Sequence, residues 1–312
     1  MRIEIYNSSL KKKWDGFVSI ARNTHFMFYR DYVEYHNTRF SDHSLLIYDD
    51  RSRLSALLPA NLDGDVLYSH QGLTFGGLIL DIHTCAEEVL QIFSELKQFL
   101  IQRRIRKLIY KCLPYIYFSQ PSDEDRYALF MNNALLLRRE ISSTIFIQDR
   151  GPYTKGRKWA INKALKAGIN ITESEDWDEF WKILTESLQT RHQVLPVHSL
   201  AEMKQLVNFF PENIKLFVAK KHEKILAGTV VYENRHWLHT QYMASTPEGK
   251  SVGALDLVID KLLGEYYPDK RVLDFGISNE KEGRFLNTGL IAQKESFGAR
   301  AVVHDFYEWI LT

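Results

Sequence analysis

Hydrophobic positions alternate with polar ones in several short runs and recur every three or four residues in several longer ones. Alternation is typical of half-buried strands, and the longer steps are typical of amphipathic helices. In the first half, these patterns predict a strand hairpin, a third strand, a glycine-marked loop, a helix and a closing strand. The corresponding residues are 44–48 and 54–59, then 66–70, 72–77, 86–100 and 107–112.

The same order of elements returns in the second half of the chain. A hairpin, a strand, a loop of glycine and small residues, an apolar helix and a closing strand are predicted at residues 216–219 and 225–232, then 236–244, 246–254, 252–266 and 271–275. Local sequence echoes the repeat, because Tyr68-Ser69-His70-Gln71 stands where His239-Thr240-Gln241-Tyr242 stands later. We therefore expect two copies of one α/β domain, each with a mixed, mostly antiparallel sheet flanked by helices.

The remaining segments fill the space around the two repeats. Helices are expected within 14–40, 123–137, 155–167 and 177–192, and further strands at 143–148 and 169–172. The run Arg150-Gly151-Pro152 has the composition of a turn and suits a domain boundary. The expected domains are residues 1–150 on the acceptor side and 151–312 on the acyl-donor side.

Composition narrows the class of protein. The chain has 312 residues and a net charge of +1, so non-specific nucleic-acid binding is not its main property. Its two cysteines, Cys85 and Cys112, lie outside any CxxC or histidine-paired pattern, so no metal site is expected. We find no signal peptide and no apolar stretch of about 20 residues, which predicts a cytoplasmic protein without a membrane span.

The C-terminal part carries a family signature. Asp274-Phe275-Gly276-Ile277, then Gly289-Leu290, then Lys294-Glu295-Ser296-Phe297-Gly298-Ala299 resemble the DFGG–GLxxFKxxFG pattern of the Fem-type aminoacyltransferases, which are tandem GNAT proteins. The helix 157–168 resembles the family's helix after the domain junction. Residues 35–77 resemble uncharacterised bacterial GNAT-type acetyltransferases. The resemblance spans nearly the whole chain and implies acyl or aminoacyl transfer.

Two departures bear on the donor. Gln293 replaces the family's phenylalanine before the lysine, and the long helical arm that some Fem enzymes carry in the second domain is missing. We therefore expect acyl-CoA, with acetyl-CoA as the first choice, as the co-substrate in place of aminoacyl-tRNA.

A helix N-terminus with free backbone N–H groups favours the pyrophosphate of such a donor. The second-half stretch 246–254 offers Gly249, Lys250, Ser251 and Gly253, a degenerate form of the GNAT motif R/QxxGxG/A. The matching first-half stretch, 81–88, holds three carboxylates that would repel phosphate. The second half is thus the expected donor domain.

Acyl transfer to an amine needs a base for the ammonium proton and a group that stabilises the oxyanion. His239 shares one strand face with Gln241 and Met243 and has the chemistry of a base. Asp274 ends a strand where α/β folds place ligand contacts. Lys294 matches the lysine that the Fem resemblance associates with charge stabilisation.

Acceptor binding is expected in the first half. His70, Gln71 and Gly72 precede or begin a glycine-marked loop that a ligand can approach closely. Arg157, in the basic stretch 155–166, is the candidate for the phosphates of a nucleotide-linked acceptor or of tRNA.

These observations favour an acyl-CoA-dependent N-acyltransferase acting on a small-molecule or nucleotide-linked amine. An amino sugar or another precursor of a cell-surface polysaccharide is the expected acceptor. Two alternatives remain open at this point. One is an aminoacyl-tRNA-dependent enzyme that extends a peptidoglycan precursor, and the other is a non-catalytic descendant that binds a nucleotide sugar or a partner protein.

Overall fold

The computed structural model describes residues 1–311, without the side chains of residues 191 and 192, and the chain divides into two compact units. Unit 1 comprises Met1–Ile141, Lys281–Arg284 and Val303–Thr312. Unit 2 comprises Ser142–Glu280 and Phe285–Val302. Two strands, β9 (Leu135–Phe146) and β17 (Arg300–Ile310), begin in one unit and end in the other.

Unit 2 is built on a mixed sheet. The strand order is β10-β11-β12-β13-β14-β9, and neighbouring strands are antiparallel except β13 with β14, which are parallel. Its strands are β10 (Asn170–Glu173), β11 (Ile214–Lys221), β12 (Lys224–Glu233), β13 (Trp237–Ser245) and β14 (Val272–Ile277). A small hairpin adds β15 (Asn279–Glu280) and β16 (Phe285–Leu286).

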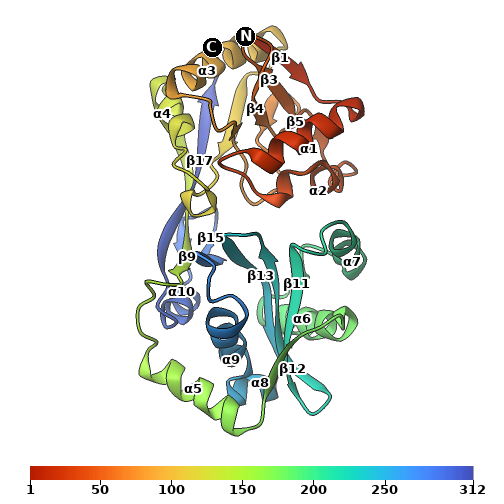
Figure 1. Ribbon diagram of the computed structural model, residues 1–312, viewed down its shortest axis with the longest axis vertical. Coiled ribbons are helices and arrows are strands. Elements are labelled where there is room, and N and C mark those ends of the chain that lie inside the picture. Colours follow the sequence, from red (N-terminus) through yellow and green to blue (C-terminus); the bar gives the residue numbers. More distant parts are fainter. Residues whose placement is uncertain (312) are drawn as a thin grey trace. The chain divides into compact units, whose positions relative to one another are not determined.

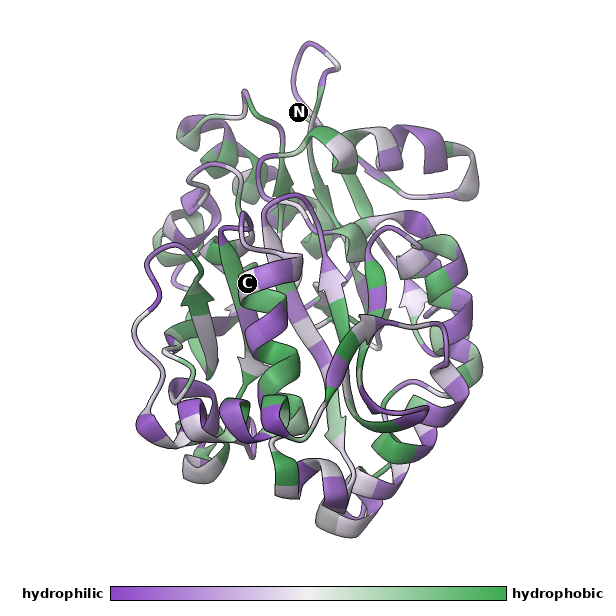
Figure 2. Ribbon diagram, turned by 60° about the horizontal axis from the view of Figure 1, so that its bottom comes forward, coloured by the Kyte–Doolittle hydropathy of each residue, from purple (hydrophilic) through white to green (hydrophobic). Residues whose placement is uncertain are grey.

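Helices cover this sheet and contribute side chains to its core. They are α5 (Lys155–Lys166), α6 (Trp177–His192), α7 (Leu200–Phe209), α8 (Pro247–Val252), α9 (Ala254–Lys261) with a π-helical extension Leu262–Tyr266, and α10 (Thr288–Glu295). Figure 1 shows α5, α8 and α9 side by side. The apolar stripe of α9 packs with Ile161 of α5 and Phe217 of β11 in one cluster. Figure 2 shows hydrophobic residues on the strands and hydrophilic ones recurring on outer helices and loops.

Unit 1 contains a four-stranded sheet in the order β1-β3-β4-β7 and a further set of strands in the order β17-β8-β6-β5-β2. Its remaining elements, in chain order, are β1 (Arg2–Ile5), α1 (Lys11–Ile20), α2 (Arg30–Glu34), β2 (Ser41–Asp42), β3 (Leu45–Tyr48), β4 (Leu54–Leu58), β5 (Asn61–Asp63), β6 (Val66–Tyr68), β7 (Ile79–Leu80), α3 (Ala86–Gln102), β8 (Lys107–Lys111) and α4 (Glu124–Met131). The stripe of α3 that includes Val89, Phe93 and Leu96 packs on these strands.

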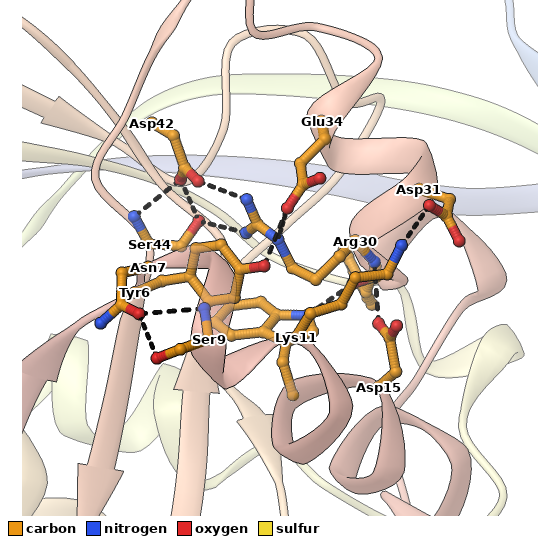
Figure 3. A network of polar contacts seen from close by, with 12 residues as sticks. Tyr6, Asn7, Ser9, Lys11, Asp15, Arg30, Asp31, Glu34, Asp42 and Ser44 are labelled. Atoms are coloured by element: carbon orange, nitrogen blue, oxygen red, sulfur yellow. Dashed lines mark hydrogen bonds and ion pairs between the residues drawn. The ribbon is translucent and has the colours of Figure 1, made fainter.

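A buried arginine ties the N-terminal segment to the sheet of unit 1 (Figure 3). Arg30 is fully buried, and its guanidinium bonds to Glu34, Ser44 and Asp42. It also lies over the ring of Tyr6, with its carbon 3.6 Å from the ring centre. A buried guanidinium is tolerated only when its donors are satisfied, so this network has a structural role.

The fold class predicted from the sequence is confirmed, and the repeat is visible in the strand register. Tyr68 pairs with Ile109 where β6 runs parallel to β8, and His239 pairs with Asp274 where β13 runs parallel to β14. In each unit a helix connects these parallel strands, α3 in unit 1 and α9 in unit 2, because parallel strands cannot be joined by a tight hairpin.

Several elements differ from the expectation. The helix expected at 123–137 ends at Met131, because the exposed run Leu135–Leu137 opens strand β9. The expected loop at 246–254 is helical, since Thr246 caps α8 and Pro247 fits its first turn. Strand β17 and helix α7 were not expected. No helix among the described residues is long and apolar enough to cross a membrane.

Candidate functional site

The two parallel strands of unit 2 open a gap at the centre of the sheet. Their paired stretch runs from Trp237 with Val272 to His239 with Asp274, while β13 continues to Ser245 and β14 to Ile277. The register of β13 on β12 skips Gln241, and the register of β14 on β9 shifts after Asp274. Both irregularities lie where the paired stretch ends, so bulges in two strands frame the gap.

A pocket of about 350 Å³ lies at this gap, a size within the range of small-molecule sites. The ends of β13 and β14 and the helices α5, α6, α8, α9 and α10 contribute its walls. The lining residues are Arg157, Ser187, Leu188, Met243, Ala244, Ser245, Lys250, Leu255, Asp256, Ile259, Phe275, Leu290, Gln293, Lys294 and Phe297. Eight of these residues are apolar, and three of the seven polar ones are cationic.

Lys294 is the buried cation of this pocket. It lies on α10 and is only 4% exposed, and its Nζ donates to the carbonyl oxygens of Gly276 and Ile277 at 2.8 and 2.7 Å. These carbonyls are accessible because Gly276 takes a φ of +76°, which favours glycine. Burial lowers the pKa of Lys294 to about 8, although the carboxylate of Asp274 acts in the opposite direction.

His239 and Asp274 form a hydrogen-bonded pair on adjacent strands. His239 Nδ1 lies 2.9 Å from Asp274 Oδ2, and because a carboxylate only accepts, Nδ1 is the donor. Asp274 is fully buried, whereas the side chain of His239 keeps 12% of its surface exposed. Gly276 lies against the imidazole, since a Cβ on it would stand 3.3 Å from His239 Cε1. The structure therefore brings Asp274, His239 and Gly276 into one cluster. Lys294 is connected to this cluster through its hydrogen bond to the carbonyl oxygen of Gly276.

The four residues expected to bind the donor are not equivalent. Lys250 lines the pocket, whereas the hydroxyl of Ser251 is turned to the carbonyl of Glu248 at 2.7 Å. A Cβ on Gly249 would stand 2.2 Å from a carbonyl of β12, and one on Gly253 would stand 2.5 Å from the carbonyl of Ala160. Gly249 thus allows α8 to approach strand β12, and Gly253 allows the start of α9 to approach α5, which accounts for both glycines without a ligand.

Arg157 lines the same pocket of unit 2 as Lys294, whereas the other acceptor candidates, His70, Gln71 and Gly72, belong to unit 1. Its guanidinium pairs with Asp256 of α9, donates to Ser296 Oγ and to the Gln293 carbonyl, and lies 4.0 Å from the centre of the Phe297 ring. Burial lowers its pKa. Most of its donors are engaged, so Arg157 joins α5, α9 and α10 at the pocket wall.

In unit 1 the equivalent gap is filled by the chain itself. Lys111, at the end of β8, donates to the carbonyls of His70, Gln71 and Leu73 at 2.9, 3.3 and 2.6 Å. His70 is 1% exposed, and burial lowers its pKa to about 3. Gln71 exchanges two hydrogen bonds with Asn61, and Gly72 packs against the ring of His36. These three acceptor candidates lie together, but the side chain of Gln71 and the backbone of Gly72 contact protein, and His70 is buried.

The carboxylates at the start of α3 are partly neutralised. Arg53 pairs with Asp81 at 2.9 Å and with Glu88 at 3.0 Å. The contrast in charge between the two helix starts is therefore weaker than residue counting suggests. The two units differ more clearly at the gap between their parallel strands. The chain itself fills this gap in unit 1, whereas a pocket is open there in unit 2.

Comparison with known proteins agrees with this architecture. Residues 156–284 match a family model described as an acetyltransferase (GNAT) domain. The crystal structure of FemX has a TM-score of 0.71 at 11% identity, over 99% of this chain and 97% of that chain. The chain has a Fem-type tandem GNAT fold. The match assigns an acetyltransferase domain of the GNAT type to residues 156–284.

Two further structures share this tandem GNAT fold. L-PGS from Bacillus licheniformis has a TM-score of 0.63 at 10% identity, over 96% of this chain and 90% of that chain. A tandem GNAT protein from the clavulanic acid biosynthesis pathway has a TM-score of 0.53 at 11% identity, over 100% of this chain and 99% of that chain. No curated protein matches the chain.

Sequence reasoning missed several pocket residues. Ser245, Asp256 and the apolar wall of Leu255 and Ile259 come from strand and helix positions with no motif. The helical step from Leu255 to Ile259 was a usable signal, because it puts both on one face of α9. Among the described residues, no group of three or more His, Cys, Asp or Glu side chains is placed to hold a metal ion.

Proposed function

We propose that unit 2 transfers an acyl group from acyl-CoA, with acetyl-CoA as the preferred donor, to an amine. The acceptor would be an amino sugar or another precursor of a cell-surface polysaccharide, and the reaction would take place in the cytoplasm. The observation that carries the proposal is the pocket between β13 and β14, which combines an apolar wall with Lys250 and the buried Lys294.

The pocket residues fit such a donor. Met243, Leu255 and Phe275 offer apolar surface to the acyl and pantetheine chain, and Lys250 lies at an exposed position where a phosphate can be paired. The wall is well suited to a mainly aliphatic arm, because apolar walls with few placed polar groups characterise small-molecule sites.

Three side chains, Lys294, His239 and Asp274, support a chemical route within this proposal. The acceptor nitrogen attacks the thioester carbonyl carbon, so that a C–N bond forms and the C–S bond breaks. His239 Nε2 takes the proton that the nitrogen loses, since Nδ1 already donates to Asp274. The ammonium of Lys294 stabilises the oxyanion, and the sulfur leaves as a thiolate that takes a proton from solvent.

A thermal-shift screen tests this function. A ligand that binds only the folded state stabilises it by about 2.7 kcal/mol at 100 times its Kd. We expect acetyl-CoA to raise the melting temperature and desulfo-CoA to do so nearly as well, with UDP-amino sugars as candidate acceptors. A chain that responds to neither CoA compound, but does respond to aminoacyl-tRNA, would contradict the proposal.

A second function has one specific observation in its favour. Helix α5 carries Lys155, Lys158, Lys163 and Lys166 and no acidic residue, with Trp159 65% exposed among them. Such a face suits the phosphates of a nucleic acid. An aminoacyl-tRNA-dependent transfer onto a peptidoglycan precursor is therefore the alternative. Loss of tRNA retention in a Lys158→Glu, Lys163→Glu variant would support it.

A further inference from the structure

Two hydroxyl groups on a distant strand hold the carboxylate of Asp274. Ser142 Oγ donates to Asp274 Oδ1 at 2.5 Å, and Thr144 Oγ1 donates to the same oxygen at 3.0 Å. Both residues lie on β9, about 130 positions earlier in the chain, and β9 pairs directly with β14. The two side chains share one face of the strand because they are two positions apart.

The two oxygens of the Asp274 carboxylate accept hydrogen bonds from different donors. Oδ1 accepts from the two hydroxyls, and Oδ2 accepts from His239 Nδ1. Asp274 is fully buried, where an ionised carboxylate is stable only if it is well hydrogen-bonded. Without donors on Oδ1, the carboxylate could rotate or shift along the strand, and Nδ1 would lose its fixed acceptor.

The tautomer of His239 depends on that acceptor. A neutral imidazole carries one proton, and the partner of one ring nitrogen decides which nitrogen holds it. With Nδ1 donating to Asp274, the lone pair is on Nε2. The other charged group at this cluster is Lys294 on α10, which bonds the carbonyls of Gly276 and Ile277.

We propose that Ser142 and Thr144 are positioning residues that fix the carboxylate of Asp274 and, through it, keep the proton of His239 on Nδ1. Their effect on turnover rests on the proposed function, in which His239 Nε2 is the base. Their effect on the tautomer does not, because it is a property of the folded chain alone.

The test removes the two hydroxyls and keeps the shape of the core. The variant Ser142→Ala, Thr144→Val lacks both donors, and Ser142→Thr, Thr144→Ser retains them. Ser143→Ala is the matched control, because Ser143 is equally buried on the same strand but faces the opposite side of the sheet. Nitrogen-15 NMR of the imidazole, at a pH where it is neutral, reports the tautomer of His239 in each protein.

We expect a single Nδ1–H tautomer in the wild type, in Ser143→Ala and in the conservative pair, and a mixture in the variant without hydroxyls. With an acceptor in hand, that variant should lose about 10- to 100-fold in kcat with KM nearly unchanged, since misplacing a reacting group costs rate. A wild-type tautomer in the hydroxyl-free variant would overturn the inference. A tautomer shift without any change in kcat would uphold it and contradict the role of His239 as base.

Discussion

Replacing Lys294 with methionine removes the charge at the pocket and keeps most of the side-chain volume. The ammonium donates to the carbonyls of Gly276 and Ile277 and is 4% exposed. A cation fixed in a pocket of low polarity stabilises a developing oxyanion more than it helps bind the ground state. Losing one such group costs on the order of 10²–10³ in kcat, with a smaller change in KM.

The same substitution should change stability little. Lowering the pKa of this lysine to about 8, from an ordinary value of 10.5, corresponds to about 3 kcal/mol against its charged form in the folded state. Two lost charge-assisted hydrogen bonds act in the opposite direction, at about 1.5–3 kcal/mol each. These contributions largely cancel, so we expect the melting temperature of Lys294→Met to stay within a few degrees of the wild type.

The pH dependence of both stability and activity follows from the lowered pKa of Lys294. Between about pH 8 and 10.5 the unfolded lysine keeps its proton and the folded one loses it. The stability contribution of this residue therefore rises with pH across that window. Activity should move the other way, because the catalytic charge disappears as pH rises through about 8. Lys294→Met should lack both dependences.

The assay is the release of free CoA thiol in the presence of an acceptor found in the ligand screen, followed from pH 6 to 10 by a discontinuous colour reaction. Lys12→Met, which removes an exposed lysine of α1, is the matched control and should behave as the wild type. A Lys294→Met enzyme with near wild-type kcat and an unchanged alkaline decline would refute the assignment of Lys294 to the chemical step.

Two more predictions concern the loop and helices before α9. Lys250→Gln should raise the Kd for acetyl-CoA, measured by calorimetry, about tenfold, because the variant removes a phosphate partner at the pocket. The control Ser251→Ala should leave this Kd unchanged. Equal Kd values in the two variants would count against a phosphate at Lys250. Gly253→Ala should lower the free energy of unfolding, measured in urea, by about 1–3 kcal/mol. The φ of Gly253 is +76°, and the new Cβ would stand 2.5 Å from the carbonyl oxygen of Ala160. An unchanged urea midpoint would contradict this prediction and show that α5 can move away.

Much of the architecture could be predicted from the sequence because local hydrophobic periodicity specifies it. The repeated order of strands and helices needs only the spacing of apolar residues, and His239, Asp274 and Lys294 stand at recognisable strand and motif positions. The pairing of His239 with Asp274 depends on register between strands that are 35 positions apart in sequence, which no local pattern reveals.

The errors have physical causes as well. The leucine run at 135–137 continues a helical pattern, yet it is exposed and belongs to a strand. Gly249 and Gly253 stay predicted donor contacts, and the close backbone approach that they permit in the structure is to β12 and α5. The role of Ser142 and Thr144 could not be predicted from the sequence, because it depends on a buried carboxylate that only the folded chain brings next to their hydroxyl groups.

The central claim is that the acyl donor binds in unit 2, at the gap between β13 and β14. Hydrogen–deuterium exchange of the full chain with saturating acetyl-CoA measures this directly. The account predicts slower exchange at the end of β13 and through α8 and the start of α9, residues 243–257, with the unit 1 segment 69–88 unchanged. Protection confined to segment 69–88, or no protection anywhere at saturating donor, would contradict it.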